Sequence, residues 1–408
     1  MERKALVVNL ALLLALAAAI FVIKGCGRME IAAGLHPPPV TAPSIWEEVS
    51  PEQIRFGEPR MVFTDSFGFR IVGWISSDEV LIRRGIKPGG RGSAIEVFNV
   101  RTREVKRLAE GAFSGDPVWN PVRRAVVYLQ YDEARKQRDL IWQSLDTLEK
   151  KKLASDVILP IVLIESGKGA AAYSVKEKAL TGRSIVPGAQ VRNLPFAQYE
   201  MRVPTPYEWI YQTKVSPDGK WQVVFNIEHF LLISTELEQI KEIDLGKEFG
   251  HKRWALEAQW SPDGKKLAII ATAGYLPNTV RFLLLLNPQT NELSEIPVPP
   301  EFVDEVSWAP GSRILLTKGG KGIIPPGFGL PGTMLVDVEA LEQREVPLFP
   351  EGLLGGDTAW SPDGTKVVFV CRPFEEGKLG HVGICISPVE VVLDQSSSSI
   401  CTWPWGEA

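Results

Sequence analysis

The feature of this sequence that most constrains its fold is a short motif repeated at nearly constant spacing. Trp-Ser-Pro-Asp-Gly stands at 260–264 and again at 360–364, and Val-Ser-Pro-Asp-Gly stands at 215–219. Weaker copies align with these, and the aligned positions are Trp74, Trp119, Val215, Trp260, Trp308 and Trp360. Successive steps between them are 45, 96, 45, 48 and 52 residues, so the long step leaves room for one degenerate copy near Gly167. Such a period is typical of architectures built from one repeated unit.

Each copy predicts four short strands. A first strand ends at the Trp, Ser-Pro-Asp-Gly makes a tight turn, and an apolar second strand such as 266–270 follows. Third strands are expected at 281–287 and 332–338, each followed by a polar turn and a fourth stretch. In the turn, Pro fixes φ for a type I geometry and Gly accepts the left-handed conformation. We therefore expect a structural role, without chemistry, for Trp119, Trp260, Asp263, Gly264, Trp308, Trp360, Asp363 and Gly364.

A four-stranded unit of this size cannot bury both of its faces alone, which predicts that the units are arranged radially. The motif "WSPDGKKLAII" and its relatives resemble the repeats of TolB-type propellers, relatives of the WD-repeat group, over roughly residues 55–395. The resemblance implies an all-β propeller of four-stranded blades. Seven blades are favoured, and six are the alternative if 121–214 holds one blade plus an insertion. The segment 59–65 is a candidate closing strand beside the C-terminal strands.

The first 28 residues predict a membrane anchor. Arg3 and Lys4 precede the run Ala5–Ile23, in which Asn9 is the one polar residue. As one transmembrane helix this run rises about 28 Å, which matches the hydrocarbon core of a bilayer. Because Lys24 follows directly, without a small-residue cleavage site, we expect an uncleaved signal anchor.

Cys26 supports a second interpretation, in which the N-terminus is a lipoprotein signal and this Cys is acylated. Either way the chain is tethered to a membrane, and we expect the propeller in the periplasm or on the extracellular side. The expected divisions are the anchor at 1–28, a Pro-rich linker at 29–54, the propeller at 55–395 and a Ser- and Trp-containing tail at 396–408.

Composition and motifs argue against several function classes. With 45 Lys plus Arg against 49 Asp plus Glu, the net charge of −4 provides no basic field for nucleic acid. The nucleophile elbow G-x-S-x-G and the calcium-loop pattern are absent. The four histidines, which show no metal-ligand spacing, are His36, His229, His251 and His381. We therefore expect no enzyme activity, no metal and no cofactor.

Four acidic residues share one position in the repeat, three residues before the Trp. They are Asp116, Glu257, Glu305 and Asp357. The resemblance implies that the strand ending at that Trp is the innermost one, so these carboxylates would meet around one mouth of the channel. Such a ring would favour a cation or a basic segment of a partner. In the alternative interpretation the acids merely solvate the loop entering each blade, and Ile71 and Gln212 at the same offset leave the ring incomplete.

The Gly- and Pro-rich loop 318–332 carries apolar residues that are candidates for docking a partner or covering the channel, namely Ile323, Ile324 and Phe328. Near the C-terminus, Cys371 and Cys385 could form a disulfide across one hairpin. Pairing of Cys385 with Cys401, and free buried thiols, are equally open.

These observations together favour a membrane-tethered, extracytoplasmic propeller that acts as a non-catalytic protein-protein interaction scaffold. Other membrane or envelope proteins are the expected partners, and the chain would be an accessory subunit of an envelope complex. The alternative is a propeller enzyme, or a sensor that binds a small ligand or cation at the acidic mouth of the channel.

Overall fold

The computed structural model describes residues 44–86, 92–164, 169–174, 179–184, 212–226, 229–235, 239–246, 253–273, 280–320, 331–350, 353–375 and 378–392. Strands dominate these residues. Their helical segments are three short 3-10 turns, η1 (Ser44–Glu47), η2 (Pro51–Gln53) and η7 (Pro300–Phe302). Within the described residues, no helix is long and apolar enough to cross a membrane. The expected anchor, Cys26 and the C-terminal tail from 396 lie outside them.

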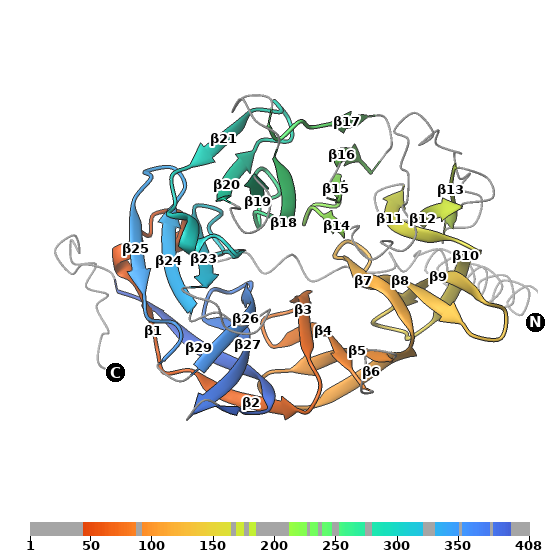
Figure 1. Cartoon of the computed structure of the whole chain (residues 1–408), viewed down its shortest axis with the longest axis horizontal. Coiled ribbons are helices and arrows are strands. Elements are labelled where there is room, and N and C mark those ends of the chain that lie inside the picture. Colours follow the sequence, from red (N-terminus) through yellow and green to blue (C-terminus); the bar gives the residue numbers. More distant parts are fainter. Residues whose placement is uncertain are drawn as a thin grey trace, which may run out of the picture. The chain divides into compact units, whose positions relative to one another are not determined.

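The strands form antiparallel sheets arranged around a central axis (Figure 1). Two four-stranded blades come first: β3 (Phe69–Trp74), β4 (Glu79–Gly85), β5 (Ser93–Asn99) and β6 (Val105–Gly111), then β7 (Phe113–Asn120), β8 (Ala125–Asp132), β9 (Gln137–Ser144) and β10 (Lys150–Ser155). A three-stranded sheet follows, with β11 (Ile158–Ile164), β12 (Gly169–Ser174) and β13 (Ala179–Ser184).

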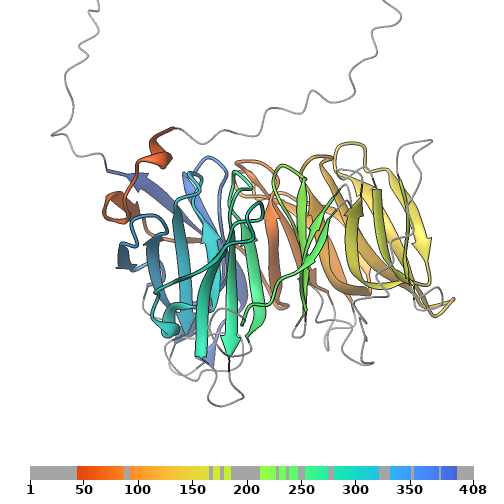
Figure 2. The same cartoon turned by 90° about the horizontal axis from the view of Figure 1, so that it is seen from above.

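Three further four-stranded blades follow. They are β14 (Gln212–Val215), β15 (Trp221–Phe225), β16 (Phe230–Ser234) and β17 (Ile240–Glu242); β18 (Trp254–Trp260), β19 (Leu267–Ala273), β20 (Val280–Leu286) and β21 (Leu293–Ile296); and β22 (Glu305–Trp308), β23 (Ile314–Gly320), β24 (Pro331–Asp337) and β25 (Gln343–Val346). The last blade contains β26 (Leu353–Trp360), β27 (Lys366–Glu375), β28 (Lys378–Leu379) and β29 (Val382–Val391), joined by β1 (Ile54–Phe56) and β2 (Arg60–Asp65). In the side view the blades stand next to one another with their strands roughly parallel to the axis (Figure 2).

Six blades therefore have four or more strands, and the fold is an all-β propeller. The expectation of seven four-stranded blades is not met by the described residues, because the degenerate copy expected in 121–214 contributes three strands. The inner strand β14 contacts β7 directly, and β11 contacts both of them. The count of four-stranded blades thus agrees with the six-bladed alternative, in which this interval holds an insertion.

The Ser-Pro-Asp-Gly turns are built as the sequence predicts. In the turn after β18, Gly264 has φ +70°, and its N–H donates to the carbonyl of Ser261. The Ser261 hydroxyl lies 2.6 Å from Asp263 Oδ1 and accepts a hydrogen bond from the N–H of Lys266. Although burial opposes it, the hydrogen bond from Ser261 helps to hold the pKa of Asp263 below its usual range. The Asp closes the turn, and the same bonds recur at 216–221 and 361–366.

The repeat Trp side chains tie neighbouring blades together. The indole N–H of Trp260 donates to the carbonyl of Lys214 at 3.0 Å, and that of Trp308 donates to Gln259 at 3.0 Å. Each acceptor directly precedes the repeat position of the blade before. The indole nitrogen of Trp360 departs from this pattern, since it is buried without a hydrogen-bond partner.

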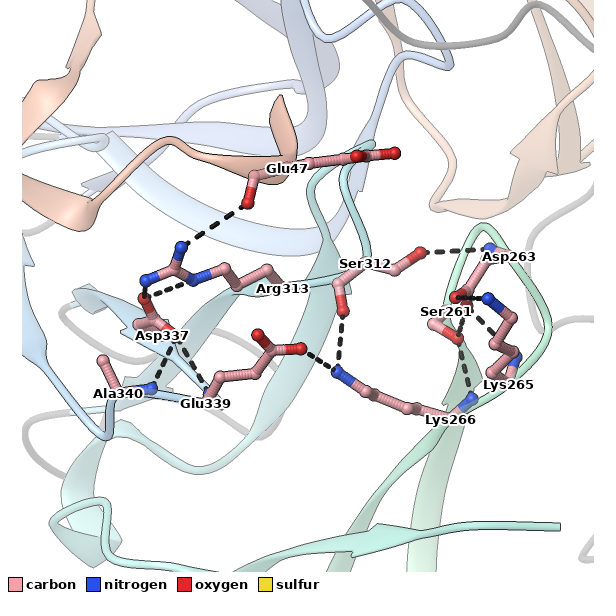
Figure 3. Close-up of polar contacts among 10 residues, drawn as sticks. All are labelled: Glu47, Ser261, Asp263, Lys265, Lys266, Ser312, Arg313, Asp337, Glu339 and Ala340. Carbon is pink, nitrogen blue, oxygen red and sulfur yellow. Dashed lines mark hydrogen bonds and ion pairs between the residues drawn. The ribbon is translucent and has the colours of Figure 1, made fainter. Parts of the chain in front are cut away.

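Polar contacts on the turn side supplement these bonds (Figure 3). The N–H of Asp263 donates to Ser312 Oγ at 3.0 Å, and Lys266 Nζ lies 2.7 Å from Glu339 Oε1, so both bonds cross between neighbouring blades. Arg313 binds the fully buried carboxylate of Asp337 through its Nε at 2.7 Å, and it also donates to the carbonyl of Glu47.

The ring closes by strand exchange between the two ends of the folded part. Strand β2 pairs with β29, which confirms the closing strand expected at 59–65, and β1 pairs with the last residues of β29. Trp46 is 3% exposed and packs edge-on against Trp360, with ring centroids 5.5 Å apart. Trp46 and Val49, which precede the propeller start expected at residue 55, belong to the same hydrophobic core as the last two blades.

A disulfide joins Cys371 on β27 to Cys385 on β29, with their Cα atoms 5.8 Å apart. This is one of the pairings that the sequence left open. Both cysteines are buried. The bond therefore crosslinks the two strands of the last blade that lie between its inner strand and the closing strands.

Candidate functional site

The structure gathers the four acidic residues of the repeat, and it adds basic residues to them. Asp116 lies on β7, Glu257 on β18, Glu305 on β22 and Asp357 on β26, all of them innermost strands of their blades. The inner charged cluster, as we call it, comprises Arg70, Arg83, Asp116, Lys214, Glu257, Glu305, Lys318 and Asp357. Every four-stranded blade contributes at least one member.

Arg70 on β3 connects two of the acids. Its guanidinium lies 3.4 Å from Asp116 Oδ2 and 3.4 Å from Asp357 Oδ2. Asp116 also pairs with Arg83 at 3.2 Å, and Asp357 accepts the backbone N–H of Ile71 at 3.0 Å. Because Asp357 and Asp116 surround it, the pKa of Arg70 is raised above its ordinary value. These two acids therefore each have a basic partner within the protein.

Irregular pairing of the inner strands accompanies three of the acids. The register shifts between Ser114 and Val118 on β7, which brackets Asp116. It shifts between Gly355 and Thr358 on β26, which brackets Asp357. A third shift, between residues 255 and 257, ends at the acid of β18. Bulges bend a strand and redirect its side chains, and they are frequent beside functional sites.

Glu305 is held by a buried lysine. Lys318 Nζ lies 3.0 Å from Glu305 Oε2 and donates to the carbonyl of Gly355 at 3.2 Å. Gly355 is required there, because a Cβ at this position would lie 2.2 Å from the ring of Phe349. The ring of Phe349 therefore packs against β26, and the ammonium nitrogen of Lys318 lies over this ring, 5.9 Å from its centroid.

Glu257 has no such partner. Burial, together with the negative charge of Glu305, raises the pKa of Glu257 to about 7. Burial and Glu305 likewise raise the pKa of Asp357. A carboxyl group that titrates near neutral pH is unusual outside functional sites.

The cluster differs from the expected acidic ring in its charge. Four basic side chains accompany the four acids, so its formal charge is balanced. The basic members were not predicted from the sequence, although two of them had a visible signal. Arg70 directly precedes the offset position Ile71, and Lys214 directly precedes the repeat position Val215. Lys318 lies on the second strand of its blade, where the repeat alignment provides no signal.

Metal ligation finds no support in the described part of the chain. No group of three or more His, Cys, Asp or Glu side chains there is arranged to hold a metal ion. His229 pairs through Nδ1 with Glu242 at 2.7 Å. His36, His251 and the docking-loop candidates Ile323, Ile324 and Phe328 lie outside the described residues.

A concavity of about 650 Å³ lies between the closing strand β2 and the first blade. Among its lining residues, the fully buried Glu96 accepts hydrogen bonds from Arg84, at 2.7 and 2.8 Å, and from Arg107 at 3.0 Å. Arg84 also pairs with Asp65. These ion pairs join the closing strand to the first blade, which indicates a structural role. The lining residues are Phe63, Thr64, Asp65, Arg84, Glu96, Val105 and Arg107.

Comparison with solved structures agrees with this architecture. Oligogalacturonate lyase from Vibrio parahaemolyticus superposes with a TM-score of 0.52 at 13% sequence identity, covering 82% of this chain and 96% of that one. The chain is a β-propeller protein. TolB from Acinetobacter baumannii is also among the matches, with a TM-score of 0.39 at 10% identity over 65% of this chain and 62% of that one.

The propeller domain of the Trilobed protease from Pyrococcus furiosus matches with a TM-score of 0.41 at 11% identity, covering 78% of this chain and 83% of that domain. No family model matches the sequence. No curated protein matches it significantly either. At these identities the likeness of this propeller to other proteins concerns its fold alone.

Proposed function

We propose that this propeller is a binding scaffold that holds a partner protein at the inner charged cluster. The observation that carries the proposal is the convergence of charged side chains from all six four-stranded blades on one region. Elsewhere in a propeller, inward-facing residues of neighbouring sheets pack as apolar core. Part of this cluster stays open to water, since the side chains of Arg70 and Asp116 are 56% and 40% exposed, so its charges are within reach of a partner.

The scaffold is tethered to a membrane and lies outside the cytoplasm. The apolar run Ala5–Ile23 has the length and composition of a membrane-spanning helix. The disulfide between Cys371 and Cys385 supports the same location, since disulfides persist in oxidising compartments such as the periplasm. Its partners are then other membrane or envelope proteins, and it acts without catalysis, as an accessory subunit.

Purification of the full-length protein from its native membrane in mild detergent, with mass spectrometry of the proteins that accompany it, tests this proposal. We expect a membrane or envelope protein at stoichiometric amounts. Neutralising the four acids of the cluster should release it: Asp116→Asn, Glu257→Gln, Glu305→Gln and Asp357→Asn. A control removes four exposed acids elsewhere, Glu133→Gln, Glu149→Gln, Glu292→Gln and Glu342→Gln, and should retain the partner.

Circular dichroism has to show that both variants are folded before their binding is compared. Release of the partner by the control as well would mean that net charge, and not the cluster, holds it. A propeller that purifies alone would contradict the scaffold and move the interpretation to the second candidate.

That second candidate is a sensor or enzyme that takes a small ligand or cation at the same cluster. The observation that favours it is Glu257, whose raised pKa of about 7 is typical of groups that exchange protons or bind ligands. Stabilisation of the isolated protein by a small molecule, lost in Glu257→Gln, would distinguish it from the scaffold.

A further inference from the structure

One end of the propeller carries the tight turns of the repeat. At this end, which we call the turn face, the first strand of each blade turns into the second. The turn between the third and fourth strands lies at the same end, because its backbone bonds to the first turn of its own blade. The N–H of Leu145 donates to the carbonyl of Arg124, and the N–H of Val338 donates to the carbonyl of Arg313. Polar contacts between neighbouring blades also lie on this face (Figure 3).

The folded part of the chain begins on the turn face. Trp46 of η1 is buried, and a Cβ at Gly311 would collide with its carbonyl oxygen, so the backbone of η1 lies directly on the turn before β23. A Cβ at Gly364, in the corresponding turn of the last blade, would collide with the indole of Trp46. The segment that precedes Ser44, with the apolar run Ala5–Ile23, is therefore attached at the turn face.

Two turns on this face present a leucine in an unfavourable backbone conformation. Leu148 and Leu341 both have φ +59°, and they are 43% and 49% exposed. The equivalent residue after β20 is Asn291, with φ +61°. In all three turns the N–H four residues earlier donates to the carbonyl of the glutamate that follows. Asparagine visits this conformation routinely and leucine does not, so the two leucines keep a strain that burial does not offset, which points to a function.

The spacing of these residues suits a flat partner. The turn with Leu148 joins β9 to β10, the turn with Leu341 joins β24 to β25, and Figure 1 shows these strand pairs on opposite sides of the ring. Ile45 on η1, also exposed, is a third apolar residue on this face. Apolar side chains so far apart form no compact patch for a globular partner, whereas a lipid surface can meet them together.

We propose that the turn face lies on the lipid surface of the membrane, with Leu148 and Leu341 inserted among the lipid headgroups. This rests on the proposed function, from which it takes the membrane tether. A glutamate follows each leucine, so these turns offer no positive charge to anionic lipid. The tether supplies the attraction instead, because it keeps the face at a high effective concentration near the bilayer, where a few apolar side chains suffice. The opposite end of the blades is then free to meet a protein partner.

The experiment uses the photoreactive residue p-benzoylphenylalanine in the full-length protein, reconstituted in nanodiscs of phosphatidylcholine. It replaces one residue at a time, either Leu148, Leu341 or the control Val280. Val280 is 45% exposed and pairs with Ala273 at the end of β19 that lies away from the turn face. After irradiation, mass spectrometry measures the fraction of protein that carries a lipid. We expect lipid adducts at positions 148 and 341, and none at position 280.

Leu341→Asn provides a second variant with two opposite effects. Asparagine is compatible with φ +59°, so the variant should unfold at a higher temperature than wild type in detergent. The same change removes an inserted apolar side chain, so the yield of lipid adducts at position 148 should fall several-fold. Val280→Asn, the matched control, should leave that yield unchanged.

The outcomes separate this inference from the proposed function. No lipid at positions 148 and 341, or equal labelling at position 280, would overturn the inference. Adducts with a protein at 148 and 341 in native membranes would overturn it as well, since the turn face would then bind a protein. A full-length protein that does not enter nanodiscs would contradict the tether and with it the proposed function, whereas one that enters without lipid adducts contradicts this inference alone.

Discussion

Replacing Glu257 by Gln should increase the free energy of unfolding relative to wild type, and this increase should be larger at neutral pH than at acidic pH. In the folded protein the pKa of Glu257 is raised from 4.5 to about 7, chiefly by burial and by Glu305. Between these values the folded state holds a proton that the unfolded chain has released. The contribution of Glu257 to the stability of the wild type therefore falls as pH rises from about 4.5, and the loss is complete above pH 7.

The magnitude follows from the size of the shift. At about 1.4 kcal/mol for each pKa unit, the ionised carboxylate costs the wild type about 3 kcal/mol at pH 8 compared with pH 4.5. Gln fills the same volume and cannot ionise, so the variant avoids this cost. For a folded part of this size, a difference of that order corresponds to roughly 4 °C in the unfolding midpoint.

The assay is thermal unfolding of both proteins, followed by circular dichroism, at several values between pH 4.5 and pH 8. Groups with shifted pKa values that do not interact with Glu257, such as Asp263 and Glu96, titrate in both proteins and cancel in the comparison. The exposed control Glu133→Gln should show no pH-dependent difference from wild type. A Glu257→Gln midpoint that stays at a constant distance from wild type across this range would refute the reasoning, since Glu257 would then titrate alike in both states.

Three further predictions concern the fold. Trp260→Phe should lower the free energy of unfolding in urea by about 1 kcal/mol more than Trp360→Phe does. The indole N–H of Trp260 has an acceptor on the neighbouring blade, whereas that of Trp360 has none. Equal losses would show that these bonds do not hold the blades together. Gly264→Ala should destabilise by about 1 kcal/mol, because it forces a Cβ into φ +70°, and a neutral result would contradict the turn geometry. Replacing Cys371 and Cys385 together by Ala should cost about 3 kcal/mol for a loop of this length. The chain has four cysteines, so four free thiols in the unreduced, denatured wild type would exclude the disulfide.

Much of the fold could be predicted because its determinants are local. The geometry of a Ser-Pro-Asp-Gly turn depends on about five consecutive residues. Gly264 adopts the positive φ and Asp263 accepts the hydrogen bond of the Ser261 hydroxyl, and neither role requires residues from elsewhere in the chain. Repetition then supplied the architecture, since identical units have to pack on one another to bury both faces. The closing strand β2 could be predicted as well, because its segment has a strand pattern but lies outside the repeated units.

The candidate site was predicted in part. The shared offset from the repeat Trp located the four acids, because equivalent positions in equivalent blades must lie at equivalent places around the axis. It did not predict which of them would be paired. Arg70 reaches Asp357 because the first and last blades meet when the ring closes.

What the sequence by itself determined is therefore the repeated unit: its turns, its strands and the positions that face the axis. The tertiary structure decided the number of four-stranded blades, the packing of Trp46 on the last blade and the pairing of each charge. The physical reason is distance along the chain. A turn is fixed by neighbours in sequence, whereas the pKa of Glu257 depends on burial and on charges from four other blades that no local pattern relates to it.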